Sequence, residues 1–408
     1  MSPLSNVQSP AKSPEHAHRR PPLLFRLIVL CGSLFLALFV AEVALRAVAP
    51  KRSAYRVWMP NLRHEFHPDA KLLPGLPEKA HFSVNSLGLR GPELPEVNDS
   101  YRILALGGST TECLYHDDST TWTARLMALL GTTPSGKTVW VGNAGRSGMN
   151  SGDHVLQTKY LLGDLPKMDM AVLLVGINDL VAALGQPETY KPASVDLSPG
   201  DNEEAVRRAF WVVPTEVDSA WKAKAPFFAR LQLYNLVKQL KGDAGKSTFA
   251  QDDSGKIVGI WRGHRQKAGQ ILENLPDLSG PLSVYRQNLL TIVDLAAQKS
   301  VKLVFLTQPT LWKKDSSAEE KALFWMGGVG QFQREPGHDY YSPGALAEAM
   351  VKFNQTLLDV CKERSLNCID LAELVPRDTS IFYDDCHFGT RGADLIANRI
   401  AEHLRKLL

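Results

Sequence analysis

Short apolar runs alternate with helical patterns along most of this chain, and this alternation restricts the fold more than any other feature. Five runs have the length of buried strands: Arg102–Leu106, Lys137–Val141, Met170–Val175, Val301–Leu306 and Asn367–Leu371. Apolar residues recur at helical spacing in five further stretches: Thr121–Leu130, Asp153–Leu162, Tyr285–Lys299, Ala345–Arg364 and Gly392–Leu408. Strands that alternate with helices predict an α/β domain whose parallel sheet is covered on both faces.

The composition excludes several classes of protein. Hydrophobic residues make up 44% of the 408 residues and charged residues 22%, which is typical of globular chains and excludes a collagen, a coiled coil or a wholly disordered protein. A net charge of +3 is too small to indicate a nucleic-acid partner. Five cysteines in a chain of this length exclude a small disulfide scaffold.

The first fifty residues stand apart. Residues 1–22 contain five prolines among polar residues and predict a disordered tail. Residues 23–45 follow, with an uninterrupted apolar stretch at Leu27–Ala41. As a helix, this segment would be about 34 Å long, enough to cross a bilayer, and it lacks the polar stripe of a buried core helix. We therefore expect a transmembrane anchor.

A cleaved signal peptide is the main alternative to this anchor. The segment Ala47-Val48-Ala49 has the small-x-small pattern of a signal-peptide cleavage site. Because Pro50 follows it and is unfavourable for cleavage, we favour the uncleaved form. Basic residues flank both ends of the apolar run, so their distribution gives little indication of how the helix is oriented in the membrane. Residues 46–100 are punctuated by proline and predict a linker and a lead-in segment. Residues 101–408 predict the main domain, with an insertion at about 181–282 that could act as a lid.

Reactive side chains follow the predicted strands. The four loops that carry them are Gly107–Glu112, Gly142–Ser151, Gly176–Asp179 and, before the last helix, Asp384–His387. Ligand sites in open α/β sheets gather at the carboxyl ends of the strands. Each loop alone is a weak signal, since a Gly-Gly-Ser turn or a lone histidine is usually structural. Their occurrence in order, each in a strand-end loop, is specific.

These residue types suit acyl transfer by a serine nucleophile. A serine hydroxyl such as that of Ser109 needs a base, which His387 can supply, and Asp384 can fix the tautomer of that histidine. The backbone N–H groups of Ser109 and Gly148 and the side-chain amide of Asn178 can stabilise a developing oxyanion. No metal or other cofactor is required.

The four loops resemble the SGNH hydrolases, the GDSL-like esterase superfamily, from about Arg102 to the C terminus. The resemblance implies a flavodoxin-like three-layer α/β/α sandwich with a five-stranded parallel sheet. It identifies Ser109 as the nucleophile, Gly148 and Asn178 as further oxyanion donors, His387 as the base and Asp384 as its partner. The segment Val84–Glu93 also resembles the lead-in of bacterial membrane-anchored members.

The chain departs from the family pattern at one position, because the usual Gly-Asp-Ser is Gly107-Gly108-Ser109 here. Several neighbours also have alternative readings. Asp385 is an alternative partner for His387, and Asp179 is expected to be structural. Glu112 and His116 are expected to face solvent. Trp325 could line a sugar or acyl pocket, although a packed loop tryptophan is the commoner case.

The cysteines suggest two disulfides. Once Ser109 and His387 are placed together by the resemblance, Cys113 and Cys386 should be neighbours, and Cys361 lies close in sequence to Cys368. Two such bonds would indicate an oxidising compartment, with the catalytic domain periplasmic or at the cell surface. Four buried free thiols are the alternative.

The sequence therefore predicts a membrane-anchored serine esterase that cleaves acyl esters, acetyl esters among them, on substrates that include acylated carbohydrates. An O-acyltransferase acting on cell-envelope polysaccharide and a non-catalytic carbohydrate-binding relative are the alternatives. No nucleic-acid partner is expected.

Overall fold

A computed structural model describes residues 22–48, 51–95, 100–186, 203–234, 236–237 and 252–408. The predicted disordered tail lies outside the described residues, apart from its last residue, as do two stretches of the predicted insertion, 187–202 and 238–251. The chain forms two compact units. One comprises Met1–Pro50 with Ala225–Ala244, and the other comprises Lys51–Lys224 with Gly245–Leu408.

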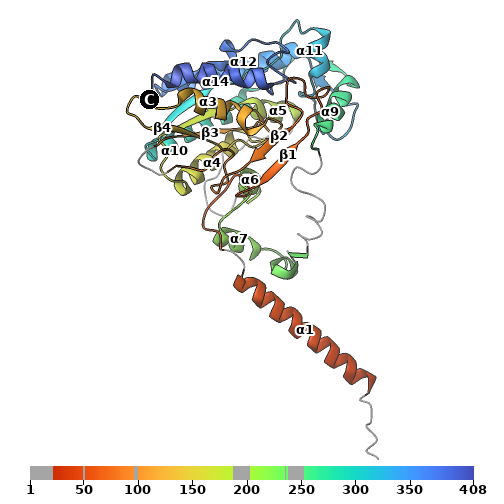
Figure 1. Cartoon of the computed structure of the whole chain (residues 1–408). Helices are drawn as coiled ribbons and strands as arrows, with labels where there is room; N and C mark the ends of the chain where they lie inside the picture. Colours follow the sequence, from red (N-terminus) through yellow and green to blue (C-terminus); the bar gives the residue numbers. More distant parts are fainter. Residues whose placement is uncertain (1–21, 49–50, 96–99, 187–202, 235, 238–251) are drawn as a thin grey trace, which may run out of the picture. The chain divides into compact units, whose positions relative to one another are not determined.

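A five-stranded parallel sheet lies at the centre of the larger unit (Figure 1). Its strands are β3 (Ser100–Gly107), β4 (Thr138–Asn143), β5 (Met170–Leu174), β7 (Lys302–Leu306) and β9 (Asn367–Ile369). The strand order is β4-β3-β5-β7-β9, and every neighbouring pair is parallel. Strands β3 and β5 are buried along their whole length, as expected for strands covered on both faces. The predicted α/β sheet is confirmed.

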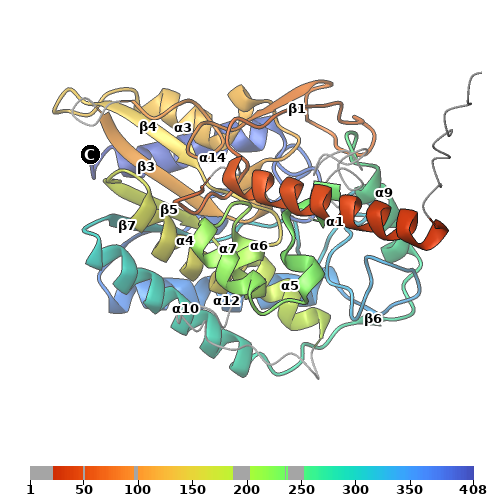
Figure 2. The same cartoon turned by 90° about the horizontal axis from the view of Figure 1, so that it is seen from below.

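Helices cover both faces of this sheet. The long ones are α3 (Trp122–Leu130), α4 (Ser151–Asp164), α10 (Ser279–Gln298), α12 (Pro343–Glu363) and α14 (Thr390–Leu404). Helix α3 packs on α14, and α10 packs on α4 and α12. Figure 2 shows the strands between α3 and α14 on one side and α4 and α10 on the other. The result is the three-layer sandwich that the sequence predicts.

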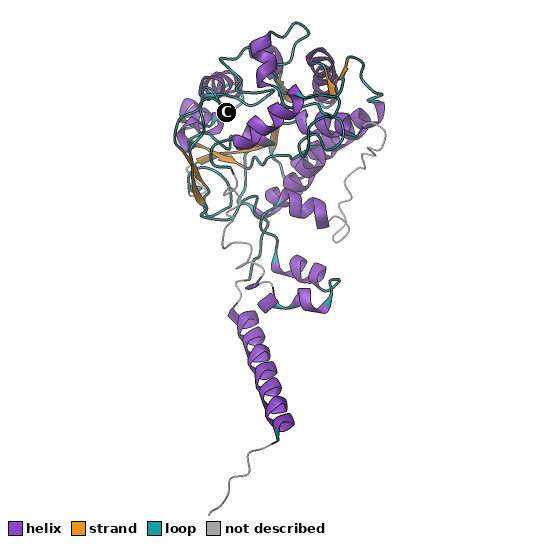
Figure 3. Cartoon of the chain, turned by 90° about the vertical axis from the view of Figure 1, so that its right-hand side faces the viewer, coloured by secondary structure: helices purple, strands orange, loops and turns teal. Residues whose placement is uncertain are grey.

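Shorter elements lie mainly at the strand ends and in the predicted insertion. Those at strand ends and in later loops are α2 (Ser109–Glu112), η2 (Asp118–Thr120), α5 (Ile177–Gly185), α11 (Ala318–Leu323), β8 (Tyr340–Tyr341) and α13 (Leu371–Leu374). Those within 181–282 are α6 (Glu203–Ala209), α7 (Thr215–Lys222), η3 (Phe227–Arg230), α9 (Lys256–Gln266) and β6 (Ile271–Leu272). The insertion thus consists mainly of short helices and loops where it is described. Figure 3 distinguishes helices, strands and loops along the chain.

The stretch before the sheet differs from the expected linker. It contains the antiparallel pair β1 (Arg63–Phe66) and β2 (Ala80–Ser83) and belongs to the larger unit from Lys51 onward. Its aromatic side chains Trp58, Phe66 and Phe82 are buried against one another. Its frequent prolines therefore mark turns in a packed segment, because aromatic burial supplies the core contacts that a free linker lacks.

The first unit contains helix α1 (Leu23–Val48), which is 26 residues long and buries none of them. It is long and apolar enough to cross a membrane, a property that a signal sequence shares. The helix extends three residues beyond the predicted end at residue 45 and is drawn as one unbroken helix in Figure 3.

Candidate active site

Ser109 follows strand β3, with Gly108 between them, and begins the short helix α2. Neighbouring side chains approach the two glycines before it closely. A Cβ on Gly107 would lie 2.1 Å from Thr111 Oγ1, and one on Gly108 would lie 2.5 Å from Asn178 Nδ2. Backbone N–H groups in the first turn of a helix have no partner within that helix, so the Ser109 N–H points out of α2.

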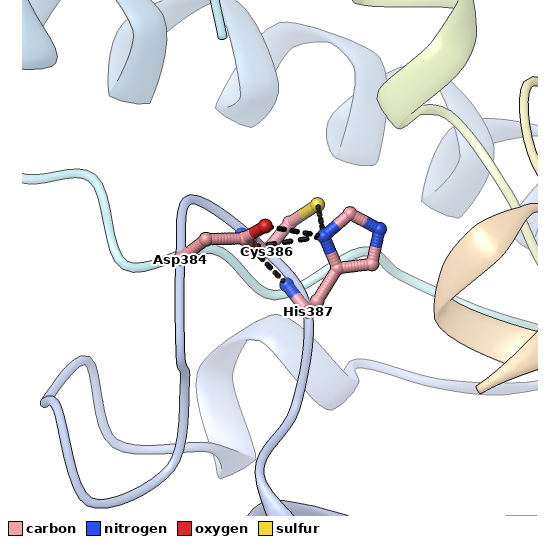
Figure 4. Close-up of side chains that lie close together, drawn as sticks. All are labelled: Asp384, Cys386 and His387. Carbon is pink, nitrogen blue, oxygen red and sulfur yellow. Dashed lines mark hydrogen bonds and ion pairs between the residues drawn. The ribbon is translucent and has the colours of Figure 1, made fainter. Parts of the chain in front are cut away.

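The structure brings Ser109, His387 and Asp384 into one hydrogen-bonded chain. Ser109 Oγ lies 2.7 Å from His387 Nε2, and His387 Nδ1 lies 2.7 Å from Asp384 Oδ2. Figure 4 shows the Asp384 carboxylate directed at this ring nitrogen. Asp384 also accepts the backbone N–H of His387 at 2.8 Å. The carboxylate therefore fixes both the position of the ring and the tautomer with hydrogen on Nδ1.

Burial and charge act in opposite directions on this pair. Burial alone would lower the pKa of His387, but the neighbouring Asp384 carboxylate outweighs it and raises that pKa well above its usual value. Burial alone would raise the pKa of Asp384, but the charge and hydrogen bonds of His387 keep it below its usual value. Asp384 is 1% exposed, so its negative charge acts almost without screening by water.

The two other predicted oxyanion donors follow the strands on either side of β3. Gly148 lies in the loop after β4, is exposed, and has φ +80°, where a side chain would be strained. Asn178 is the second residue of α5, after β5, and one hydrogen of its amide is donated to Met149 O at 2.8 Å. The close approach of Asn178 Nδ2 to Gly108 places this amide beside the residue that precedes Ser109.

Glu112 and His116 are buried, so the expectation that they face solvent is wrong. Glu112 accepts a short hydrogen bond from the hydroxyl of Ser147, next to Gly148, and burial raises the pKa of its carboxyl group. His116 Nε2 lies 2.8 Å from Phe388 O, which is next to His387 in the chain. Both residues follow Ser109 closely and point inward, because α2 is covered by the loop after β4 and by the loop that carries Asp384 and His387.

Arg90 supports the turn that carries Ser109, and no pattern in the sequence indicated this role. Its guanidinium is 2% exposed and donates to the carbonyl oxygens of Glu112 and Cys113 at 2.8 and 2.6 Å, directly behind α2. It also donates to His116 O at 2.6 Å and pairs with Asp118 Oδ1 at 3.1 Å. The lead-in segment therefore supports the turn that carries Ser109, which its position in the sequence did not indicate.

Trp325 and Asp385 hold the acidic end of the site. The indole N–H of Trp325 donates to Asp384 Oδ2 at 2.9 Å, so this buried tryptophan supports the carboxylate. Asp385 accepts from the indole of Trp312 at 2.7 Å and from the backbone N–H of Trp325 at 2.8 Å. It is held by these groups, and Asp384 is the carboxylate that bonds to His387. Asp179, expected to be structural, accepts the backbone N–H of Ser151 at 3.0 Å.

One of the two predicted disulfides is present. Cys361 and Cys368 are bonded, whereas Cys113 and Cys386 are free and buried, so the predicted Cys113–Cys386 bond is wrong. The Cys113 thiol turns back to Thr110 O at 3.4 Å, because Cys113 adopts a left-handed backbone conformation with φ +53°. The Cys386 thiol packs 3.9 Å from Met326 Sδ. Each thiol therefore has a contact other than the predicted partner.

Among the described residues, one group has the spacing of metal ligands: Asp384, Cys386 and His387, whose ligand atoms lie within 4.8 Å of one another. Two of these donors are already bonded to each other. Burial raises the pKa of the Cys386 thiol to about 11, which disfavours the thiolate that a metal would need. The chemistry of this donor set fits a proton relay better than a metal centre.

Solved structures and one family model resemble this chain. Solved structures with similar folds include a lipolytic protein of the G-D-S-L family from Desulfitobacterium hafniense DCB-2 (10% identity, TM-score 0.37, covering 74% of this chain and 99% of that one). They also include an acetylxylan esterase from Geobacillus stearothermophilus (11% identity, TM-score 0.38, covering 74% and 94%). These likenesses are too distant to inform on function, and no curated protein matches the chain. The model of the GDSL-like lipase/acylhydrolase family matches residues 105–395, well over half of the chain. The protein therefore belongs to the GDSL-like lipase/acylhydrolase family and is a hydrolase of ester bonds.

Proposed function

We propose that this protein is a serine esterase in which Ser109 attacks the ester carbonyl, His387 carries the proton and Asp384 orients His387. The observation that carries the proposal is the 2.7 Å contact between Ser109 Oγ and His387 Nε2, continued by the 2.7 Å contact between His387 Nδ1 and Asp384. A general base must lie within hydrogen-bond reach of the proton that it removes, and this one does.

The reaction proceeds in two halves. Ser109 Oγ forms a bond to the acyl carbon while its proton passes to His387 Nε2, and the carbonyl oxygen becomes an oxyanion. Collapse of this intermediate breaks the ester bond, and the departing alcohol takes the proton from His387. Water then attacks the acyl carbon and gives its proton to His387. Collapse of the second intermediate breaks the bond to Ser109 Oγ, which takes that proton from His387, and releases the carboxylic acid. Asp384 stabilises the imidazolium in both halves.

The oxyanion is held by three donors from three adjacent strand ends. They are the backbone N–H groups of Ser109 and Gly148 and the second hydrogen of the Asn178 amide. Strand order places β3 between β4 and β5, which gives these loops a common sheet edge. Such fixed donors cost no reorganisation when charge develops, so they stabilise the transition state more than the substrate.

We also propose that α1 is an uncleaved membrane anchor and that the catalytic unit lies outside the cytoplasm. The length and exposure of α1 support the anchor. The Cys361–Cys368 disulfide supports an oxidising compartment. Acylated carbohydrate of the cell envelope, acetyl esters included, is the substrate class that we propose for an anchored esterase of this kind.

The test is hydrolysis of p-nitrophenyl acetate by the full-length protein in detergent. We expect turnover by the wild type and a loss of about 10⁴-fold or more in both Ser109→Ala and His387→Ala. Ser219→Ala, at an exposed serine of α7, is the matched control and should retain full activity.

Other outcomes assign the other functions. Transfer of an acetyl group to a polysaccharide acceptor without hydrolysis, abolished by Ser109→Ala, would identify an O-acyltransferase. Equal inactivity of all variants towards ester and acceptor, with carbohydrate binding intact, would identify a non-catalytic relative and overturn the proposal.

A further inference from the structure

The first unit contains a cluster of exposed apolar side chains outside α1. It comprises Phe227, Phe228, Tyr234, Leu236 and Val237, which we call the apolar loop cluster. Phe227 is 75% exposed and Phe228 55% exposed, although the rings of Phe228 and Tyr234 pack edge to face. Aromatic and aliphatic side chains exposed together usually mark a surface that another apolar phase covers.

This cluster is fixed to one end of α1 by a carboxylate. Glu42 accepts the backbone N–H groups of Gln232 and Leu233, each at 2.9 Å. These two residues begin a helical segment, so Glu42 caps N–H groups that the segment itself cannot satisfy. Arg46 neutralises Glu42 at 2.7 Å and donates to Arg230 O at 3.1 Å. The segment that carries the apolar loop cluster is therefore bonded to α1 at the position of Glu42 and Arg46.

The distance along α1 from its start to Glu42 matches the thickness of the hydrocarbon core of a bilayer. Leu23 and Glu42 are nineteen residues apart on one helix, which corresponds to about 28 Å along its axis. The hydrocarbon core of a bilayer is about 30 Å thick. When the start of α1 lies at one boundary, Glu42 and the loop that it caps lie at the other. A carboxylate with an arginine and two amide partners suits that position and would be costly deeper in the bilayer.

The charge of the loop agrees with this placement. Residues 225–237 carry Arg230 and contain no acidic residue. Aromatic residues and basic residues together are typical of segments that lie in the interface between headgroups and acyl chains.

We infer that the apolar loop cluster is a second membrane contact: it inserts into the lipid interface beside α1 and, with Glu42, fixes the height of the anchor. The partner is the bilayer itself. This inference rests on the proposed membrane anchor, and it adds a site that binds lipid through Phe227 and Phe228. Segments of this kind bury their apolar face about 5–10 Å into the boundary between headgroups and acyl chains.

The test measures the depth of spin labels on the full-length protein in vesicles of phosphatidylcholine and phosphatidylglycerol. Cys31 is exposed on α1 and is first replaced by serine, whereas Cys113 and Cys386 are buried and the remaining cysteines are bonded. Labels are then placed singly at Phe227→Cys, at Leu34→Cys in α1, and at Val351→Cys in α12. Leu34 and Val351 are 59% and 55% exposed, which makes them matched apolar sites.

We expect the Leu34 label to be the deepest, and the Phe227 label to be accessible to oxygen and several-fold less accessible to a water-soluble nickel chelate than the Val351 label. A Phe227 label as accessible to nickel as the Val351 label, with the Leu34 label embedded, would overturn this inference and leave the anchor standing. A Leu34 label open to nickel would overturn the anchor and the inference with it. Adding Glu42→Ala should make the Phe227 label more mobile and leave the Leu34 label unchanged.

Discussion

Gly108→Ala tests whether Asn178 is an oxyanion donor, because it alters the position of the amide without touching it chemically. A Cβ at position 108 would lie 2.5 Å from Asn178 Nδ2, whereas ordinary contact begins at 3.4 Å. The amide must therefore retreat by roughly 0.9 Å. The φ of Gly108 is −82°, so the substitution does not place a side chain in the left-handed region.

The expected loss follows from that displacement. A misplacement of about 1 Å at a reacting centre can cost about 10²-fold in rate. Complete removal of one oxyanion donor costs about 10²–10³-fold in kcat, or about 2.7–4 kcal/mol. We therefore expect Gly108→Ala to lower kcat for p-nitrophenyl acetate by about 10²-fold, and Asn178→Ala to lower it by the same factor or more. The KM should change little, because the donors act on the transition state.

The control is Gly163→Ala in α4, the same chemical change where an added Cβ has no atom within 4 Å. It should leave kcat unchanged. The double variant Gly108→Ala/Asn178→Ala separates the two routes by which Gly108→Ala could act. If the loss is transmitted through Asn178, the double variant will be no slower than Asn178→Ala. Additive losses would mean that the added methyl group displaces Ser109, and a Gly108→Ala enzyme with full kcat would refute the assignment of Asn178.

Three further predictions concern titration and thiols. Asp384→Asn should move the acid limb of the pH profile of kcat/KM to lower pH, because the Asp384 charge raises the pKa of His387 against the opposing effect of burial. The kcat should also fall by about 10⁴-fold. An acid limb that does not move would mean that another group controls it. Burial raises the pKa of Asp179 to about 7, so its contribution to stability is present at low pH and is lost as the pH rises towards 7; urea unfolding should show this loss, up to about 4 kcal/mol, and Asp179→Asn should abolish it. Thiol titration of the unfolded chain should detect three thiols before reduction, those of Cys113 and Cys386 among them, and five after reduction. A single thiol before reduction would mean that Cys113 and Cys386 are bonded after all.

The sheet could be predicted because its signal is local. Each strand is a short apolar run followed by a helical pattern, and the predicted strand that begins at Met170 starts where β5 does. The stretch before Ser100 could not be read in the same way. Its buried residues, such as Phe66 and Phe82, are separated by prolines and polar residues, so no period appears. Their burial depends on contacts between segments that only the folded chain brings together.

Ser109, Gly148 and Asn178 could be predicted together because each lies in a loop after a strand, and parallel strands end at one edge. Asp384 and His387 lie in a later loop, between α13 and α14. Ser109 and His387 are far apart in sequence, yet the structure places them 2.7 Å apart. The direction in which a side chain points at that edge could not be predicted in the same way. Cys113 and Cys386 lie on the two loops that meet there, yet they are not bonded, and the left-handed Cys113 directs its thiol to Thr110 O.

The supports of the site escape sequence reasoning for a physical reason. Arg90 holds the nucleophile turn through carbonyl oxygens, and every residue type has one, so its partners leave no pattern in the sequence. The same support bears on the departure from Gly-Asp-Ser. A turn clamped behind α2 by a buried guanidinium does not need a side chain at position 108 to hold it. Gly108 leaves the space that the Asn178 amide occupies, so the missing aspartate and the close approach of Asn178 form one arrangement.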